Sequence, residues 1–157
     1  MILKKYNGIW FFGLSGSGKT LASNFLKTKI KKFIILDGDK IRKHISFDLS
    51  YTLKDREIQL RRVYGMALLS IDSEVFPIVS TVYMSNQIIL KLKRKNILPI
   101  QMTRDFQKIK NRKKIYNINN KNVVGRDIKM KKFAGLNLIN NSDNIENLKK
   151  KILKIIS

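Results

Sequence analysis

The chain has 157 residues, which is enough for one domain with a sizeable hydrophobic core, and it contains no cysteine. The missing cysteines exclude disulfide bonds and thiolate metal sites, and they fit a reducing compartment. Lys and Arg total 33 against 11 Asp and Glu, so the formal net charge is +22. The positive electrostatic field of such a charge attracts nucleic acid, acidic membranes or phosphorylated small molecules.

The basic residues are spread along the chain rather than gathered in one motif. Their densest runs, at 91–95, 108–114 and 129–132, lack the interleaved aromatic residues on which nucleic-acid bases stack. A solvated basic surface is therefore the favoured interpretation, and nucleic acid is an unlikely partner. The chain has no signal peptide pattern and no apolar run of about 18 residues, the length of a membrane span. We expect a soluble, cytoplasmic protein without a membrane partner.

The first predicted strand, at residues 9–12, leads directly into a glycine-rich loop. Residues 13–20, "GLSGSGKT", fit the phosphate-loop pattern G-x-x-x-x-G-K-[ST]. Glycine lets the backbone adopt positive φ angles and approach a ligand closely. Successive N–H groups can then surround phosphate oxygens at the start of a helix. The residues predicted to bind the phosphates of ATP are Gly13, Leu14, Ser15, Gly16, Ser17, Gly18, Lys19 and Thr20.

The last two residues of this loop have predicted chemical roles. Lys19 is expected to reach the β- and γ-phosphates and to act in catalysis, and the Thr20 hydroxyl is expected to ligate Mg²⁺. The alternative is a flexible Gly/Ser turn. It is disfavoured because an apolar strand precedes the motif and a helical pattern follows over 19–30, with Leu21, Phe25 and Leu26 on its expected apolar face.

A second polar group follows the strand predicted at 33–36. Asp37 and Asp39 flank a glycine, and Arg42 comes three residues after Asp39 in a helix predicted over 39–46. Phosphoryl transfer needs Mg²⁺, cations around the γ-phosphate and a carboxylate that orients or deprotonates the acceptor hydroxyl. We assign the last role to Asp39, and the holding of Mg²⁺-bound water to Asp37. The alternative is a turn in which an aspartate caps the helix.

The next predicted helix, at 54–72, carries two residues expected to face one ligand. Arg56 and Gln59 are three positions apart and therefore share a face of the helix. Arg61 and Arg62 point elsewhere, so we expect them at the surface or in ion pairs.

The rest of the chain continues an alternation of strands and helices. Further strands are predicted at 76–82, 97–102 and 136–140, and further helices at 85–95 and 143–156. The alternation predicts a parallel sheet with helices on both faces, in which ligands bind beyond the carboxyl ends of the strands. The polar, basic segment 111–133 is expected to be a lid rather than a disordered loop.

Three stretches in this order resemble the adenylylsulfate kinase family: "GIWFFGLSGSGKT", "LDGDKIR" and "DLSYTLKDREIQLRR". The resemblance runs without a gap from Gly8 to Arg62 and returns weakly at "STVYMS" and "NVVGRDI". It implies a P-loop NTPase fold and transfer of the γ-phosphate of ATP to the 3′-hydroxyl of adenosine 5′-phosphosulfate. The residues expected at the acceptor nucleotide are Asp37, Asp39, Arg42, Tyr51, Arg56, Gln59 and Val123. Ser85 falls where the family has a serine often labelled a phosphoserine intermediate, which makes it a catalytic candidate.

The chain departs from the usual family residues around the expected base pocket. Tyr51 stands where the family has Phe, Gln59 where it has Asn, and Val123 where it has a second Phe that stacks on the base. Loss of one of two aromatic faces costs about 1–3 kcal/mol of stacking in nucleic-acid platforms. The lid also looks several residues shorter than usual. The resemblance therefore leaves the identity of the acceptor base open.

The sequence predicts one P-loop kinase domain over residues 1–157, with a five-stranded parallel sheet and a lid at about 111–133. Its predicted cofactors are ATP and Mg²⁺, and a homodimer is possible. The favoured acceptor is adenosine 5′-phosphosulfate. The alternatives are cytidine diphosphoramidate, in capsule polysaccharide modification, and a basic P-loop protein acting on nucleic acid.

Overall fold

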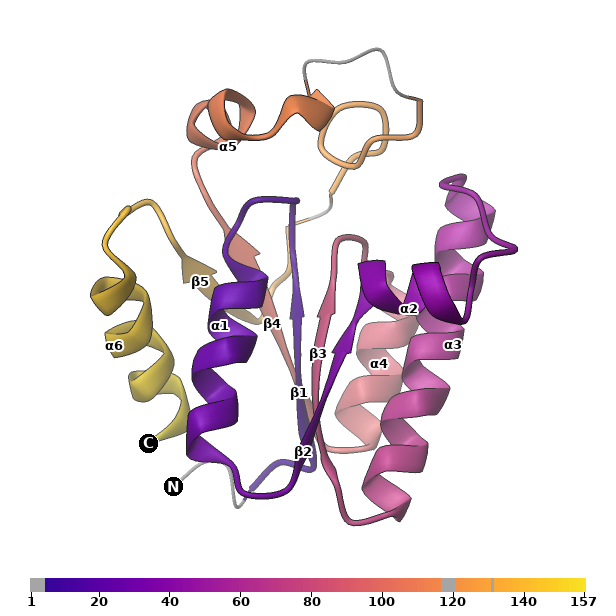
Figure 1. Cartoon of the computed structure of the whole chain (residues 1–157), viewed down its shortest axis with the longest axis vertical. Helices are drawn as coiled ribbons and strands as arrows, with labels where there is room; N and C mark the ends of the chain where they lie inside the picture. The colour runs from indigo at the N-terminus through magenta and orange to yellow at the C-terminus, as the bar shows by residue number, and fades with distance from the viewer. Residues whose placement is uncertain (1–4, 117–120, 131) are drawn as a thin grey trace.

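The structure is a computed structural model, and it describes residues 5–116, 121–130 and 132–157. Five strands form one sheet with helices on both faces (Figure 1). The strands are β1 (Gly8–Phe12), β2 (Phe33–Asp37), β3 (Phe76–Thr81), β4 (Ile97–Thr103) and β5 (Leu136–Ile139). The helices are α1 (Lys19–Leu26), α2 (Gly38–His44), α3 (Leu53–Asp72), α4 (Asn86–Arg94), α5 (Phe106–Arg112) and α6 (Ile145–Ile156), with 3₁₀ turns η2 (Lys27–Lys29) and η3 (Lys114–Tyr116).

The strand order is β2-β3-β1-β4-β5, and every neighbouring pair is parallel. The first strand of the chain is thus the central strand of the sheet. Its residue Ile9 lies opposite Ile78 of β3 on one side and Leu98 of β4 on the other. The predicted five-stranded parallel sheet is confirmed.

The two faces of β1 belong to two separate hydrophobic clusters. Successive side chains of a strand point to opposite faces, so Ile9 and Phe11 pack with α1 and α6, whereas Trp10 and Phe12 pack with α2, α3 and α4. Figure 1 shows the corresponding helix layers on either side of the sheet. Burial on both faces explains why this strand is an unbroken apolar run.

The carboxyl ends of all five strands lie at one edge of the sheet, and α5, η3 and residues 121–130 lie over this edge (Figure 1). A third, smaller cluster supports that segment. It consists of Ile109, Tyr116 and Val123, with Leu14 of the glycine-rich loop packed against it. The loop and the overlying segment therefore share hydrophobic contacts.

Three details differ from the sequence-based expectation. Helix α5 was not predicted, because its sequence is polar and only Ile109 is buried; Asp105 caps it by accepting from two backbone N–H groups. Helix α1 ends at Leu26, and Leu21 is 46% exposed rather than part of the buried face, which Ala22 and Leu26 supply. The last helix begins at 145, after Asn144 as its N-cap, rather than at 143.

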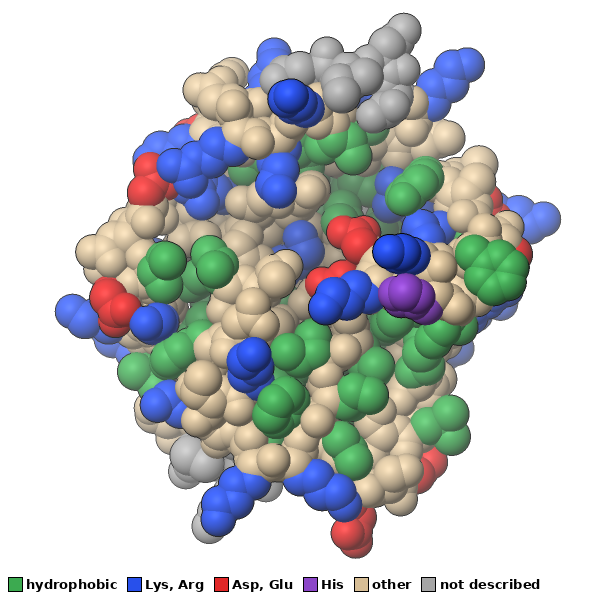
Figure 2. Space-filling view, in the orientation of Figure 1, with side chains coloured by type: hydrophobic (Ala, Val, Ile, Leu, Met, Phe, Trp, Pro, Cys, Tyr) green, Lys and Arg blue, Asp and Glu red, His purple; other side chains and the backbone are tan. Residues whose placement is uncertain are grey.

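Basic side chains are scattered over the face shown in Figure 2, without a single basic stripe, and acidic side chains gather near the hollow in its centre. This distribution supports the interpretation of the charge as a solvated surface. In the part of the chain that the structure describes, no helix has the length and apolar character needed to cross a membrane.

Candidate active site

A cavity of about 740 Å³ opens at the carboxyl edge of the sheet, a volume typical of ligand sites. Segments far apart in the sequence form its walls. The predicted residues that border it are Ser15, Gly16, Gly18, Lys19, Thr20, Asp37, Asp39, Arg42, Tyr51, Arg56, Gln59 and Val123. Gly13, Leu14 and Ser17 belong to the glycine-rich loop but do not line the cavity.

The glycine-rich loop joins β1 to α1, and its backbone requires glycine at two points. A Cβ on Gly13 would lie 2.1 Å from the carbonyl oxygen of Met102. Gly18, directly before α1, has a φ of 104°, a backbone angle that residues other than glycine rarely adopt. The loop therefore passes close to β4 and turns sharply into the helix, whose first residues Lys19 and Thr20 line the cavity. The first N–H groups of a helix have no partner within it and can bind an anion.

Lys19 is the most strongly perturbed ionisable group of the site. Its side chain is 9% exposed, and its Nζ donates to the carbonyl oxygens of Gly13 and Leu14, each at 2.8 Å. Burial lowers the pKa of Lys19 from 10.5 to about 8, although the nearby carboxylates of Asp39 and Asp37 oppose this shift. A buried amine held at the loop is suited to receive a phosphate group.

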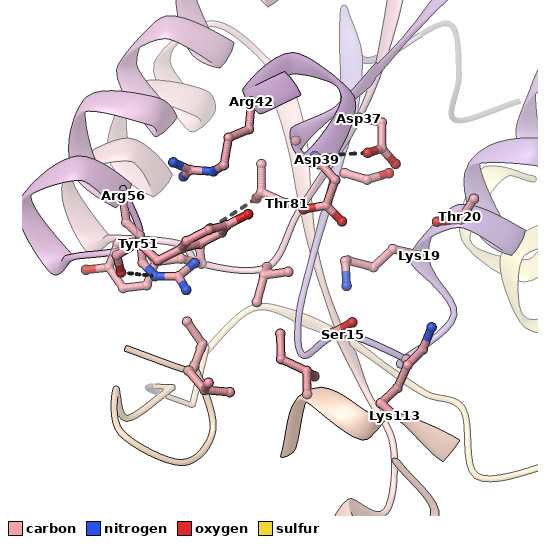
Figure 3. A pocket seen from close by; sticks show the side chains of 18 of the residues that line it. Ser15, Lys19, Thr20, Asp37, Asp39, Arg42, Tyr51, Arg56, Thr81 and Lys113 are labelled. Carbon is pink, nitrogen blue, oxygen red and sulfur yellow. Dashed lines mark hydrogen bonds between the residues drawn. The ribbon is translucent and has the colours of Figure 1, made fainter. Parts of the chain in front are cut away.

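Two carboxylates face the loop across the cavity. Asp37 ends β2 and caps α2, because its Oδ1 accepts from the backbone N–H groups of Asp39 and Lys40 at 3.0 and 3.2 Å. Asp39 lies in the first turn of α2 and is exposed to the cavity. Figure 3 shows both carboxylates near the side chains of Thr20 and Lys19. Asp37 therefore has the helix-capping role that was the alternative for this pair. The Asp39 carboxylate does not cap the helix and can contact a ligand.

The oxygen donors at this point fit a Mg²⁺ ion. Mg²⁺ binds one or two protein oxygens together with phosphate oxygens and water. Thr20 and Asp37 border the same cavity, and capping occupies only one oxygen of Asp37. Among the described residues no group of three or more His, Cys, Asp or Glu could hold a metal, so a cation here would depend on ligand phosphates.

Tyr51 lies between two arginines at the far end of the cavity (Figure 3). The guanidinium carbons of Arg42 and Arg56 are 4.7 and 5.5 Å from the centre of its ring. Arg42 Nη1 also donates to Ser50 O at 2.6 Å, and Arg56 Nε donates to Tyr51 O at 3.1 Å. The ring is therefore held by cation–π contacts, and a base that stacks on it would displace a guanidinium.

Gln59 places an unpaired acceptor in the cavity wall. Its side chain is 5% exposed, and its Nε2 donates to the carbonyl oxygen of Gly38 at 3.2 Å. Because that carbonyl can only accept, the amide orientation is fixed. The Oε1 atom is then buried without a hydrogen-bond partner among the described residues. Arg56 and Gln59 do face one cavity, and Arg62 pairs with Asp48 outside it at 2.5 Å.

The expected lid borders the cavity on both sides of residues 117–120, which lie outside the described residues, as does residue 131. On one side, Tyr116 donates its hydroxyl to Ser15 O at 3.3 Å. On the other, Asn122 O accepts from Arg56 Nη2 at 2.8 Å, and Val123 is buried in the third cluster. The segment thus contacts both the phosphate loop and the acceptor wall.

Ser85 does not line the cavity. It is the N-cap of α4, where its Oγ accepts from the backbone N–H of Ile88 at 3.4 Å. Its local geometry accounts for a helix-capping role, and a chemical role for Ser85 stays a prediction from the resemblance.

Sequence reasoning missed several side chains that border the cavity, among them Thr81, Lys113, Tyr116 and the two described next. Arg104 follows β4; its side chain is 7% exposed and pairs with Asp143, which also binds Arg112 at 3.0 Å. Tyr83 follows β3 and donates to Glu57 at 2.9 Å, and burial together with this carboxylate raises its pKa to about 12. Both residues come directly after strands, where ligand sites of parallel sheets occur, so position alone could have indicated them.

Comparison with known proteins agrees with this geometry. Residues 6–138 match the model of the adenylylsulphate kinase family. The adenylyl-sulfate kinase of Buchnera aphidicola from Acyrthosiphon pisum is 28% identical over 169 residues, covering 94% of this chain and 79% of its own. The adenylyl-sulfate kinase of Prochlorococcus marinus is 42% identical, but over 49% of this chain and 39% of its own.

Solved structures share the fold. The Mycobacterium tuberculosis APS kinase CysC, in complex with AMPPNP and APS, superposes with a TM-score of 0.82 at 21% identity, covering 96% of this chain and 97% of its own. A hexameric APS kinase from Thiobacillus denitrificans superposes with a TM-score of 0.64 at 19% identity, covering 96% of this chain and 29% of its own. At such identities the similarity establishes the fold.

Proposed function

The chain belongs to the adenylylsulfate kinase family, and on that premise we propose that it transfers the γ-phosphate of ATP to the 3′-hydroxyl of adenosine 5′-phosphosulfate. The observation that carries the proposal is a single cavity with the phosphate loop on one wall and Asp39 on the other. Phosphoryl transfer is mainly a matter of positioning and charge stabilisation. Both groups must therefore face one space, and they do (Figure 3).

The phosphate loop would hold ATP. Its N–H groups would surround the β-phosphate, and the Lys19 ammonium would exchange its two carbonyl partners for oxygens of the γ-phosphate. The Thr20 hydroxyl and Asp37 would hold Mg²⁺, which when bound neutralises charge on the β- and γ-phosphates. These residues orient the terminal phosphate toward the opposite wall.

Asp39 would act on the acceptor. Its exposed carboxylate would accept a hydrogen bond from the 3′-hydroxyl and then its proton, while the hydroxyl oxygen forms a bond to the γ-phosphorus. The bond between that phosphorus and the β–γ bridging oxygen breaks, and ADP leaves. Lys19 stabilises the negative charge that shifts onto the leaving oxygen.

The acceptor wall suits an anionic nucleotide. Arg42 and Arg56 supply two positive charges beside Tyr51, and Gln59 lines the same cavity. The comparisons do not favour cytidine diphosphoramidate or nucleic acid as acceptor. The homodimer and closure of the lid over bound nucleotides stay predictions.

The test is an assay of ADP release against a panel of acceptors. The panel contains adenosine 5′-phosphosulfate, cytidine diphosphoramidate, unmodified nucleotides and oligonucleotides, each at saturating ATP and Mg²⁺. We expect turnover with adenosine 5′-phosphosulfate to exceed turnover with every other acceptor. Higher kcat/KM with the cytidine compound or with an oligonucleotide would overturn the proposal.

A further inference from the structure

The loop between β5 and α6 reaches behind the phosphate loop. Its first residue, Asn140, is 5% exposed, and its Nδ2 donates to the carbonyl oxygen of Ser17 at 2.9 Å across 123 positions of sequence. Asn140 does not line the cavity, so the Ser17 carbonyl is bonded on the side away from it. This contact links the end of β5, the last strand in the chain, to the middle of the phosphate loop.

A phosphate-binding loop needs such a partner for a physical reason. Its N–H groups must point toward the anion, which turns neighbouring carbonyl oxygens toward the protein interior. Ser17 is fully buried, so its carbonyl has no access to water. A buried carbonyl without a donor is strongly disfavoured. The Asn140 amide supplies that donor and makes the inward orientation of the N–H groups compatible with burial.

The contact leaves little freedom for the loop. A Cβ on Gly18 would lie 2.5 Å from Asn140 Nδ2, so the amide packs directly against the backbone that enters α1. Asn140 is itself fixed, because its backbone N–H donates to Thr103 O at 2.8 Å. A rotation of the Ser17 peptide would break the hydrogen bond to Asn140.

We propose that Asn140 is a positioning residue for nucleotide binding: it holds the Ser17 peptide so that the phosphate loop presents its N–H groups to ATP. The role in turnover rests on the proposed function. Nucleotide binding alone, measured without an acceptor, tests the positioning role independently of what the acceptor is.

The neighbouring residue provides a matched control. Asn141 uses its Oδ1 atom, which accepts from the backbone N–H of Asp105 at 2.7 Å. Substitution by aspartate keeps this acceptor but removes an Nδ2 donor. Asn140→Asp and Asn141→Asp therefore add the same charge to the same loop, and only the first replaces a donor that faces a carbonyl oxygen.

The experiment measures the Kd of the ATP analogue AMPPNP by titration calorimetry, together with KM for ATP and for the acceptor. We expect Asn140→Asp to weaken AMPPNP binding and raise KM for ATP by roughly 10- to 100-fold, with KM for the acceptor unchanged. Asn141→Asp should stay within about twofold of the unmodified protein, as surface changes usually do. Protonation of the new carboxyl restores a donor, so the Asn140→Asp deficit should shrink as pH falls.

Two results would overturn the proposal. One is an Asn140→Asp protein that binds AMPPNP as tightly as the unmodified chain. The other is an equal loss in both variants, which would show a general charge effect. Should Asn140→Asp not fold, Asn140→Leu removes the donor without adding charge, and the same 10-fold or greater loss is expected. A merely structural role would lower the melting temperature and leave the Kd of the folded protein unchanged.

Discussion

The two walls of the cavity are built in different ways. The phosphate wall is one continuous stretch, residues 13–20, which follows the central strand β1 and carries the buried Lys19. The acceptor wall combines α2, the start of α3, the residues around Tyr51, and the lid end near Val123. More than half of Tyr51 is exposed. We expect the first wall to act mainly through backbone N–H groups, and the second to act through side chains.

Because the two walls are built differently, we expect substitutions in them to have different effects. Backbone groups locked by a central strand are preorganised, which suits the charge stabilisation of phosphoryl transfer. The arginines of the acceptor wall donate to the carbonyls of Ser50 and Asn122, partners that a substrate can replace. We therefore expect changes in the phosphate wall to reduce turnover with every acceptor, and changes in the acceptor wall to act on acceptor binding.

The largest effect is expected for Lys19→Ala. We expect its ammonium to be the cation that contacts the γ-phosphate, so kcat should fall about 1,000-fold while the fold remains intact. Lys27→Ala, an exposed lysine just beyond the same helix, should leave kcat unchanged. The measurement is steady-state ADP release with circular dichroism as a check of folding. Turnover of Lys19→Ala within tenfold of the unmodified protein would contradict the assignment.

Asp39→Asn tests the acceptor-wall group that we expect to act on the hydroxyl itself. The amide cannot take the hydroxyl proton, so kcat should fall about 100-fold with little change in KM for ATP. Asp72→Asn, at the exposed end of α3, is the control. A change limited to KM for ATP would place Asp39 on the phosphate wall instead.

Tyr51→Ala should affect only the acceptor wall. Loss of the ring removes a stacking surface and the support for two guanidiniums, so KM for the acceptor should rise about 10-fold with ATP binding unchanged. Phe47→Ala removes an aromatic ring of the same loop that is 80% exposed and does not line the cavity. Equal effects of the two changes would show that the loop, and not the Tyr51 ring, supports the acceptor.

The smallest effect concerns the protonation of Lys19. Its pKa of about 8 means that the amine is mostly neutral in the free protein above this pH. A bound triphosphate raises the pKa, so nucleotide binding at about pH 8.5 should take up a fraction of a proton, and binding at about pH 6.5 should take up almost none through this group. Titration calorimetry in buffers of different ionisation enthalpy measures the uptake. Lys19→Arg should abolish it, because arginine stays charged throughout.

Much of the fold could be predicted from the sequence, because the strands are short apolar runs that alternate with helical patterns. All five strands and five of the six helices named above were located. Helix α5 was missed because its apolar pattern is reduced to Ile109, although Asp105 is an ordinary N-cap signal. The helix is fixed by tertiary contacts of Ile109 with Tyr116 and Val123, which no local pattern shows.

The residues of the candidate site also differ in how far the sequence alone could identify them. The phosphate loop and the Asp37–Asp39 pair could be found from local motifs, because their chemistry depends on residues that are adjacent in sequence. Tyr51 and Val123 were reached only through resemblance to a family. Asn140 could not be assigned at all from the sequence, since its role depends on one hydrogen bond to Ser17 across 123 positions.

The strand order has a consequence for how the protein is made. β1 emerges first, yet its pairing partners Ile78 and Leu98 of the neighbouring strands are synthesised much later. Contacts between distant segments form slowly, because the intervening chain must first lose entropy. During synthesis, the phosphate loop is thus present long before β3, β4 and Asn140 can hold it. We therefore expect nucleotide binding to appear only after these later segments have been made and have packed against the phosphate loop.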